Sequence, residues 1–264
     1  PAFDPETGLL YVNANEMAWI IKAIDVEYQS PTNETYTSAG SRLYKQNCMS
    51  CHGPELEGGG NYPDLLKVKE KHNLDSLNDI ILSGRRMMPA FSHLHQNEIL
   101  AISAFLLDKK ELGNRKFIAF DKKEDAYTQL PYTITGYNKF LSIEGYPAIR
   151  PPWGTLNAIN LNTGKIEWKT PLGNHPDFAG KGIITGTENY GGPVVTAGGL
   201  VFIAASSDEK FRAFNKRSGK LLWETDLPAS GFATPAVYEY DGREYVVIAC
   251  GGGKLGTRSG DSYV

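Results

Sequence analysis

The chain has 264 residues, with 27 Lys and Arg against 30 Asp and Glu, and a formal net charge of −3. That near-neutral charge argues against a protein that binds nucleic acid through a basic surface, and 41% hydrophobic residues exclude a disordered chain. The 28 glycines and 15 prolines favour a turn-rich β protein. No apolar run approaches the ~20 residues that cross a bilayer, and no signal peptide is visible. Because residue 1 is Pro and the last residues read as the opening of a strand, we expect a segment cut from a longer polypeptide.

The first zone, residues 1–30, carries β signals. Residues 3–8 predict a turn, because they hold an Asp-Pro pair and a glycine. Residues 9–14 and 19–24 are apolar runs that predict one strand each. We expect this zone to supply propeller strands.

The second zone, residues 31–113, changes to helical patterns. Residues 39–47 and 75–83 predict two short helices, and residues 96–109 predict a third whose apolar side chains recur at helical spacing. Residues 114–131 are charged and loop-like, which predicts a solvated linker.

Cysteine usage gives the sharpest chemical signal. Cys48 and Cys51 stand immediately before His52 in a C-x-x-C-H string, which is typical of covalent haem attachment through two thioether bonds with the histidine at the iron. A thioredoxin-type dithiol would need a surrounding βαβ pattern, and a zinc site would need a second Cys/His pair; neither stands out. The third cysteine, Cys250, ends an apolar run and is expected to be a buried strand thiol.

The third zone, residues 132–264, is β again and contains an internal repeat. Residues 158–170 align with residues 213–225 at an offset of 55, and each copy reads as strand, Gly-containing hairpin turn and strand ending in Trp. Residues 193–205 add a hairpin before the second copy. The recurring Trp could also belong to the core of a β-sandwich, but the period of four strands favours a propeller blade.

The strand count predicts how the zones combine. Residues 1–28 and 132–171 each supply two strands of one blade, which makes the helical zone an insertion inside that blade. Residues 193–227 form a second blade and residues 232–250 begin a third. A propeller closes with ~4–8 blades, so most blades are expected to lie upstream of this segment.

Four strings carry a family resemblance: AFDPETGLLYVNAN at 2–15, PPWG at 151–154, ENYGGP at 188–193, and GGG at 251–253 with SGD at 259–261. They resemble the C-terminal part of pyrroloquinoline-quinone (PQQ)-dependent dehydrogenases of the glucose/alcohol type, and the helical zone resembles a class I cytochrome c domain. The implied fold is multidomain: an all-β propeller segment of four-stranded blades, from an eight-bladed propeller, with an inserted all-α cytochrome c domain. The family's catalytic acidic residues and calcium ligands are expected upstream, so no catalytic residue is assigned here.

The resemblance also implies the haem ligands. His52 is one axial ligand, and Met88 is the other because the ligand methionine of such cytochromes often precedes proline; the adjacent Met87 remains the alternative. Pro63 resembles the proline whose carbonyl accepts a hydrogen bond from the axial imidazole, with an ordinary loop proline as the competing interpretation. Arg85, with its neighbour, is placed to neutralise haem propionates, although a solvated loop explains it equally.

Other polar residues of the helical zone receive structural interpretations. His72, His93 and His95 are expected at the surface, and Lys67, Lys69 and Lys71 form a basic patch that either steers an acidic redox partner or is only solvated. By resemblance, Gly40 and Phe105 form the crossing of the first and last helices.

The resemblance implies that Asn15 and Tyr190 contact the quinone, with Asn189 as a further choice. Each of these residues could instead cap a turn. The string GGGKLG at 251–256 satisfies G-x-G-x-x-G, but turn residues rather than a helix follow, which rejects a dinucleotide site. By resemblance, this glycine loop brings backbone near the quinone.

The implied function is that of an oxidoreductase fragment. The intact protein would be a PQQ-dependent dehydrogenase (EC 1.1 type), with PQQ and calcium, that oxidises a sugar or alcohol. Its haem c would relay electrons to a redox acceptor protein or quinone, in the periplasm or at the outer face of the cytoplasmic membrane. The segment alone is expected to bind haem, to lack activity and to associate through its sheet edges. The alternatives are an electron-transfer cytochrome c carrying a β accessory domain without quinone, and a propeller scaffold that binds a protein partner.

Overall fold

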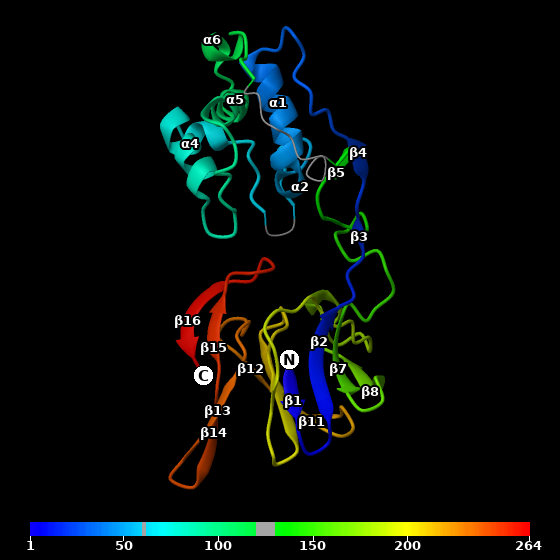
Figure 1. Cartoon of the computed structure of the whole chain (residues 1–264). Coiled ribbons are helices and arrows are strands. Elements are labelled where there is room, and N and C mark those ends of the chain that lie inside the picture. Colours follow the sequence, from blue (N-terminus) through cyan, green and yellow to red (C-terminus); the bar gives the residue numbers. More distant parts are fainter. Residues whose placement is uncertain (60–61, 120–129) are drawn as a thin grey trace. The chain divides into compact units, whose positions relative to one another are not determined.

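The structure, a computed structural model, describes residues 1–59, 62–119 and 130–264. The chain forms two compact units: unit 1 comprises residues 1–18 and 140–264, and unit 2 comprises residues 19–139 (Figure 1). The boundaries expected from the sequence, at 30/31, 113/114 and 131/132, all fall inside unit 2, and the charged run at 121–125 lies outside the described residues.

Unit 2 is built on short helices. In chain order they are α1 Tyr36–Asn47, α2 Met49–His52, α3 Val68–Lys71, α4 Leu74–Ser83, α5 Gln96–Leu106 and α6 Lys110–Gly113. Helix α1 begins three residues earlier than expected, because Thr35 and Ser38 form a reciprocal capping box. Helix α5 ends at Leu106 instead of Lys109, since Asp108 adopts a left-handed φ of 50°.

The helices of unit 2 enclose one apolar core. Helices α1 and α5 cross at Gly40, where a Cβ atom would lie 2.1 Å from the Ala101 carbonyl oxygen and 2.6 Å from the Phe105 Cβ. Only a glycine permits this close approach, so the predicted crossing pair of Gly40 and Phe105 is confirmed. The buried core residues are Ala39, Leu43, Tyr44, Met49, Val68, Leu77, Ile81, Leu94, Ile99, Ala101, Ile102, Leu106, Leu107 and Phe117.

Unit 2 also holds two short β ladders where the chain enters and leaves it. Strand β3 (Trp19–Ile20) pairs with β6 (Asn138–Lys139), and β4 (Ala23–Asp25) pairs with β5 (Tyr132–Ile134), both antiparallel. The single propeller strand expected at 19–24 is therefore wrong. The run is broken in two, because its partners are the two halves of the returning segment and not a blade strand.

In unit 1 the first four-stranded sheet has the order β1-β2-β7-β8 (Figure 1). Its strands are β1 Ala2–Asp4, β2 Leu9–Asn15, β7 Gly154–Asn160 and β8 Lys165–Pro171. Strand β1 occupies part of the expected turn, which is shorter because the Gly8 N–H closes it on the Asp4 carbonyl at 2.9 Å. The insertion falls between β2 and β7, so its predicted position inside a single blade is confirmed.

The second four-stranded sheet has the order β12-β11-β10-β9 and confirms the blade predicted over 193–227. Its strands are β9 Val194–Val195, β10 Leu200–Ile203, β11 Lys210–Asn215 and β12 Leu221–Asp226. The sequence repeat is also a structural repeat. A β-bulge follows Ala158 in one copy and Ala213 in the other, and the side chains of Asn160 and Asn215 each accept the N–H two residues on.

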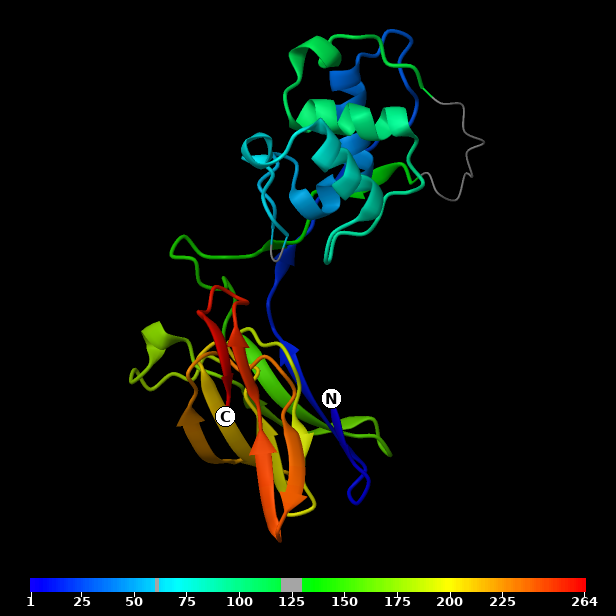
Figure 2. The same ribbon diagram turned by 90° about the vertical axis from the view of Figure 1, so that its left-hand side faces the viewer.

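The last strands pair in twos. Strand β13 (Ala236–Tyr240) pairs with β14 (Arg243–Val247), and β15 (Ala249–Gly252) pairs with β16 (Ser259–Tyr263), as the hairpin arms in Figure 2 show. The apolar run that ends at Cys250 is thus divided between β14 and β15. The turn residues expected after the glycine loop include residues 259–261, but these lie in strand β16, where Ser259 pairs with Gly252. Strand β16, and not a helix, follows the glycine loop.

The core of unit 1 lies between its sheets. Tyr11, at 0% exposure, donates its hydroxyl to the Lys216 carbonyl at 3.0 Å, and so joins the first sheet to the second. Cys250 is buried as predicted. The main apolar cluster consists of Leu9, Tyr11, Leu156, Ala158, Leu172, Val201, Ile203, Ala205 and Phe214.

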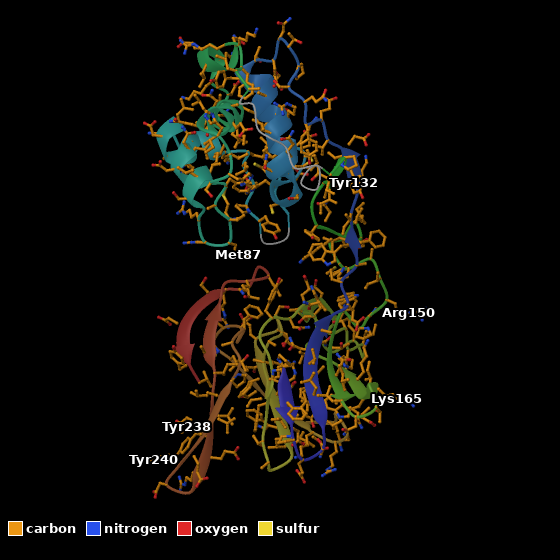
Figure 3. All side chains as sticks on the ribbon, viewed as in Figure 1. Met87, Tyr132, Arg150, Lys165, Tyr238 and Tyr240 are labelled. Atoms are coloured by element: carbon orange, nitrogen blue, oxygen red, sulfur yellow. The ribbon has the colours of Figure 1, made fainter. Side chains whose placement is uncertain are left out.

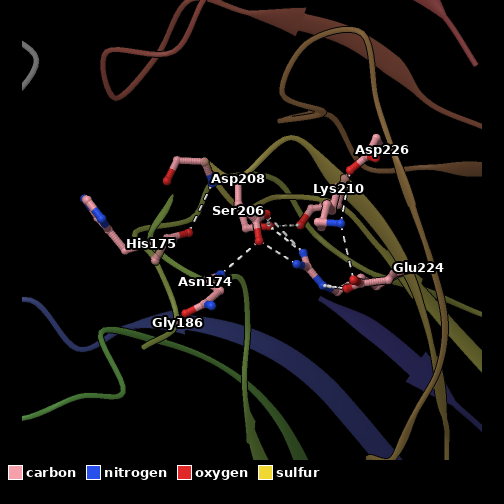
Figure 4. A network of polar contacts seen from close by, with 12 residues as sticks. Asn174, His175, Gly186, Ser206, Asp208, Lys210, Glu224 and Asp226 are labelled. Carbon is pink, nitrogen blue, oxygen red and sulfur yellow. Dashed lines mark hydrogen bonds and ion pairs between the residues drawn. The ribbon is translucent and has the colours of Figure 1, made fainter. Parts of the chain in front are cut away.

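A polar network fastens the connection between the two sheets (Figure 4). The Asp208 carboxylate accepts bonds from the Arg212 guanidinium, the Ser206 hydroxyl and the Asn174 N–H. Arg212 also contacts Glu224 on β12 at 3.2 Å. The Asp208 and Arg212 side chains are both buried, and the bond from the Asn174 N–H joins this pair to the segment that follows β8.

Candidate functional site

The C-x-x-C-H motif lies at the junction of two helices. Cys48 caps the end of α1, and both the Cys51 and His52 N–H groups bond to its carbonyl, at 3.1 and 3.0 Å. Helix α2 stops at Gly53, whose φ of 78° is a left-handed conformation that suits glycine. One helical turn therefore brings the two half-buried cysteines and the buried His52 together.

The His52 ring has a defined orientation. Its Nδ1 lies 2.9 Å from the Pro63 carbonyl oxygen. A carbonyl only accepts, so Nδ1 carries the proton and the other ring nitrogen, Nε2, is the one available to a metal. This is the second-sphere bond that metal-binding histidines commonly make.

Pro63 directly follows Tyr62, which forms an antiparallel bridge with Gly59. The Tyr62 N–H bonds to the Gly59 carbonyl at 2.9 Å, and the Gly59 N–H returns to the Tyr62 carbonyl at 3.3 Å. Gly58 precedes this bridge with φ 71°, and a Cβ atom there would lie 2.6 Å from the Tyr62 carbonyl oxygen. This glycine therefore permits the close approach of the segment that carries the Pro63 carbonyl.

Met88 stands at the end of a short hairpin, which an antiparallel bridge to Arg85 closes. The Arg85 and Met88 backbones exchange two hydrogen bonds of 3.0 Å, and Gly84 precedes them with φ 72° and the same close approach. Met88 is half-buried against the apolar core to which Cys48 also packs. Met87 is 72% exposed, at the outer tip of its loop (Figure 3). The hairpin thus turns one methionine inward and the other outward.

The remaining charged candidates of unit 2 lie at its surface. Arg85 is exposed, as is its neighbour Arg86, which has a left-handed φ of 56°. His95 caps helix α5 by accepting the Asn97 N–H, which gives it a structural role. His72 is half-buried beside Ser76, His93 is exposed beside the Phe91 ring, and the three lysines of the basic patch are exposed.

Tyr44 is a residue that the sequence reasoning missed. Its hydroxyl donates to the Gly53 carbonyl at 2.6 Å, and its ring is 2% exposed. Burial raises the pKa of this hydroxyl well above its ordinary value, so the phenol stays protonated. The available signal was its spacing, since Gly40, Tyr44 and Cys48 follow one another at four-residue steps.

The donor set fits haem c. Cys48 packs against the apolar core of unit 2, and burial raises the pKa of its thiol to about 12. Imidazole and thioether are the axial donors of cytochromes c. Within the described ranges, no group of three or more His, Cys, Asp and Glu side chains could hold a metal ion by itself.

The quinone candidates of unit 1 form a compact asparagine pair. The Asn15 amide donates to the Asn189 carbonyl at 3.1 Å, and the Asn189 N–H donates to Asn15 Oδ1 at 2.7 Å. The Asn189 amide donates in turn to the carbonyls of Ala14 and Thr187 and accepts from Asn13. Both side chains are thus engaged in tying the 187–189 segment to strand β2.

Tyr190 follows this pair and is half-buried. Its N–H bonds to the Ala205 carbonyl at 2.9 Å, and its ring meets Phe232 edge to face at 6.4 Å. Lys254, from the loop between β15 and β16, lies 4.9 Å from the ring centre, within the range of a cation–π contact. The glycine loop therefore reaches Tyr190 through a side chain.

These features define a class: part of a propeller whose blade carries an inserted c-type cytochrome unit. A family model described as glucose/ethanol/alcohol dehydrogenase, beta-propeller domain, matches residues 75–246, and one described as cytochrome c oxidase, cbb3-type, subunit III, matches residues 36–106. The first match covers well over half of the chain. The chain therefore belongs to the glucose/ethanol/alcohol dehydrogenase β-propeller family, and the cytochrome c match implies haem c.

Individual dehydrogenases are also similar to this chain. The chain is 42% identical over 142 residues to the quinoprotein glucose dehydrogenase of Escherichia coli K12, which is 51% of this chain and 18% of that protein. It is 41% identical over 129 residues to the glycerol dehydrogenase large subunit of Gluconobacter oxydans, which is 46% of this chain and 17% of that protein. The chain thus spans less than a fifth of the length of these relatives.

Among solved structures, the quinohemoprotein alcohol dehydrogenase from Comamonas testosteroni aligns at 27% identity with a TM-score of 0.33. That alignment covers 49% of this chain and 18% of the other. In the described part of this chain, no helix is both long enough and apolar enough to cross a membrane.

Proposed function

We propose that this chain is the haem-bearing part of a quinoprotein dehydrogenase that oxidises a sugar or an alcohol. The observation that carries the proposal is the presence, within one blade of a dehydrogenase-family propeller, of a C-x-x-C-H helix whose histidine bonds a proline carbonyl. PQQ with calcium would take two electrons from the substrate, and haem c would pass them on one at a time.

In this proposal the residues of unit 2 divide the work of holding haem c. Cys48 and Cys51 would provide the thioether links, and His52 and Met88 would provide the donors to the iron. Pro63 orients the imidazole through the 2.9 Å bond to its Nδ1. Of the two adjacent methionines, Met88 is assigned because it packs inward while Met87 is exposed.

Two further roles belong to the same proposal. Arg85, exposed at the base of the methionine hairpin, would neutralise a haem propionate. Tyr190 would contact the quinone with its ring, while Asn15 and Asn189 hold the Tyr190 segment against strand β2. The acceptor is an external redox protein or quinone, and the location is the periplasm or the outer face of the cytoplasmic membrane.

Two observations favour the enzyme over the two alternative functions. An electron carrier with a β accessory domain would not need a propeller of the dehydrogenase family, and the family match therefore favours the enzyme. A propeller scaffold without redox chemistry would not need a bonded histidine beside two cysteines.

The test uses the full-length protein with PQQ and calcium. In the unaltered enzyme, sugars or alcohols should reduce the haem, as followed by its visible spectrum. In a Cys48→Ser/Cys51→Ser double variant, substrate should still reduce a dye that takes electrons from the quinone. An external redox protein or quinone that takes its electrons from the haem should no longer be reduced. Haem that stays oxidised in the unaltered enzyme with every substrate would refute the relay.

A further inference from the structure

Tyr44 is bonded to both ends of the C-x-x-C-H motif. Its backbone carbonyl accepts the Cys48 N–H at 2.8 Å, where the motif begins. Its side-chain hydroxyl donates to the Gly53 carbonyl at 2.6 Å, one residue beyond the point where the motif ends. One residue therefore closes a ring of hydrogen bonds around residues 48–53.

The bond from the Tyr44 hydroxyl lies at the Gly53 end of the motif, where the backbone is less regular. Helix α2 is a single turn, and Gly53 leaves it with a left-handed φ of 78°. A turn this short has few bonds of its own to fix its last residues. The Gly53 carbonyl directly follows His52, so a bond to that carbonyl restrains the backbone that carries the imidazole.

Tyr44 is itself held rigidly. Its ring is 2% exposed and lies 5.7 Å from the Phe105 ring of α5, beside the Gly40 crossing. The hydroxyl therefore connects the packed contact of α1 and α5 with the segment that presents His52. A buried phenol in a fixed ring is a precise donor, because little rotamer freedom remains to it.

We propose that Tyr44 is a positioning residue for the haem. Its hydroxyl restrains the backbone that carries His52, while the Pro63 carbonyl restrains the imidazole ring itself. This inference rests on the proposed attachment of haem to the chain. Its consequence is electronic as well as structural, because the orientation of an axial imidazole and the exclusion of water around it tune the haem potential.

The experiment compares the haem-loaded chain with its Tyr44→Phe variant, which keeps the ring packing and removes only the hydroxyl. Loosening the end of α2 admits water, which favours the more highly charged oxidised haem. At a fixed ambient potential, we expect the ratio of oxidised to reduced haem to rise about threefold, a fall of about 30 mV in midpoint potential. The haem-methyl resonances of the oxidised protein should shift as well.

Tyr36→Phe is the matched control. It removes a hydroxyl from the same helix and keeps the edge-to-face contact of the ring with Phe117 at 5.4 Å. Its potential and haem-methyl pattern should equal those of the unaltered chain. Haem that stays with the protein after acid–acetone extraction verifies the attachment separately, so that failure of the proposed function and failure of this inference give different results.

Gly53→Ala perturbs the acceptor of this bond, the Gly53 carbonyl, instead of the Tyr44 donor. It should change the midpoint potential and the haem-methyl resonances in the same direction as Tyr44→Phe, since φ 78° is strained for alanine. Gly145→Ala, at a left-handed glycine of unit 1 with open space around it, controls for such strain. An unchanged potential and haem-methyl pattern in Tyr44→Phe, with or without a loss of thermal stability, would overturn the proposal.

Discussion

At the scale of single residues, the two adjacent methionines show how one backbone turn assigns different roles to identical side chains. Met88 packs on the core shared with Cys48, while Met87 is 72% exposed. A thioether bound to haem iron gives a characteristic charge-transfer band and raises the potential. Met88→Ala should therefore abolish this band and lower the potential, and Met87→Ala should change neither. Visible absorption and redox titration measure both, and the reverse pattern would assign Met87 as the ligand.

A buried ion pair makes the stability of unit 2 depend on pH. Arg42 donates two bonds of 2.8 Å to Glu34, which also accepts the Ser30 hydroxyl. Burial alone would raise the pKa of Glu34, but the bonds from Arg42 and Ser30 hold it below its ordinary 4.5. A carboxyl with a lowered pKa stabilises the fold above that ordinary value, and the contribution is lost as the pH falls below it.

Replacing Glu34 by Gln tests this coupling. At pH 7 the free energy of unfolding of unit 2 should fall by about 2 kcal/mol, the worth of charged hydrogen bonds. The difference between the variant and the unaltered protein should shrink below the ordinary pKa of 4.5, where protonation removes the same charge. Urea unfolding, followed by circular dichroism at several pH values, measures this difference in the free energy of unfolding. A difference that is constant across the pH range would contradict the assigned pair.

At the scale of elements, the crossing of α1 and α5 is the contact on which the haem-binding helix is built. Gly40→Ala would place a Cβ atom 2.1 Å from the Ala101 carbonyl oxygen, so the helices must separate. We expect a loss of about 1–3 kcal/mol from overpacking, although alanine is the better helix former. The denaturation midpoint measures the effect, with the exposed Lys45→Ala of the same helix as control. A stabilised Gly40→Ala would refute the crossing.

The sequence predicted those elements that local chemistry specifies. The repeat with Asn160 and Asn215 fixed its hairpins, because each Asn caps its own turn, and the helical spacing from Ile99 to Leu106 identified α5. The strand at 19–24 was mispredicted, since an apolar run does not reveal that its partners lie more than a hundred residues away. Likewise, the Tyr44 bond depends on the fold around Gly53 and leaves only a faint spacing signal.

At the scale of the whole molecule, the chain contains a cytochrome unit with its own core and two four-stranded blades with another. The apolar contacts of unit 2 lie within residues 19–139, so covalent haem attachment should not need substrate or quinone. The proposed electron relay requires a haem that is fixed to the chain, so covalent attachment is its first requirement.

The most direct test is the acid–acetone extraction of the purified chain, produced in cells that attach haem to C-x-x-C-H motifs. We expect the haem to stay with the protein and its pyridine haemochrome spectrum to be that of a haem with two thioether links at Cys48 and Cys51. In the Cys48→Ser/Cys51→Ser double variant, any bound haem should instead pass into the organic phase. Haem that is extracted freely from the unaltered chain would contradict the central claim.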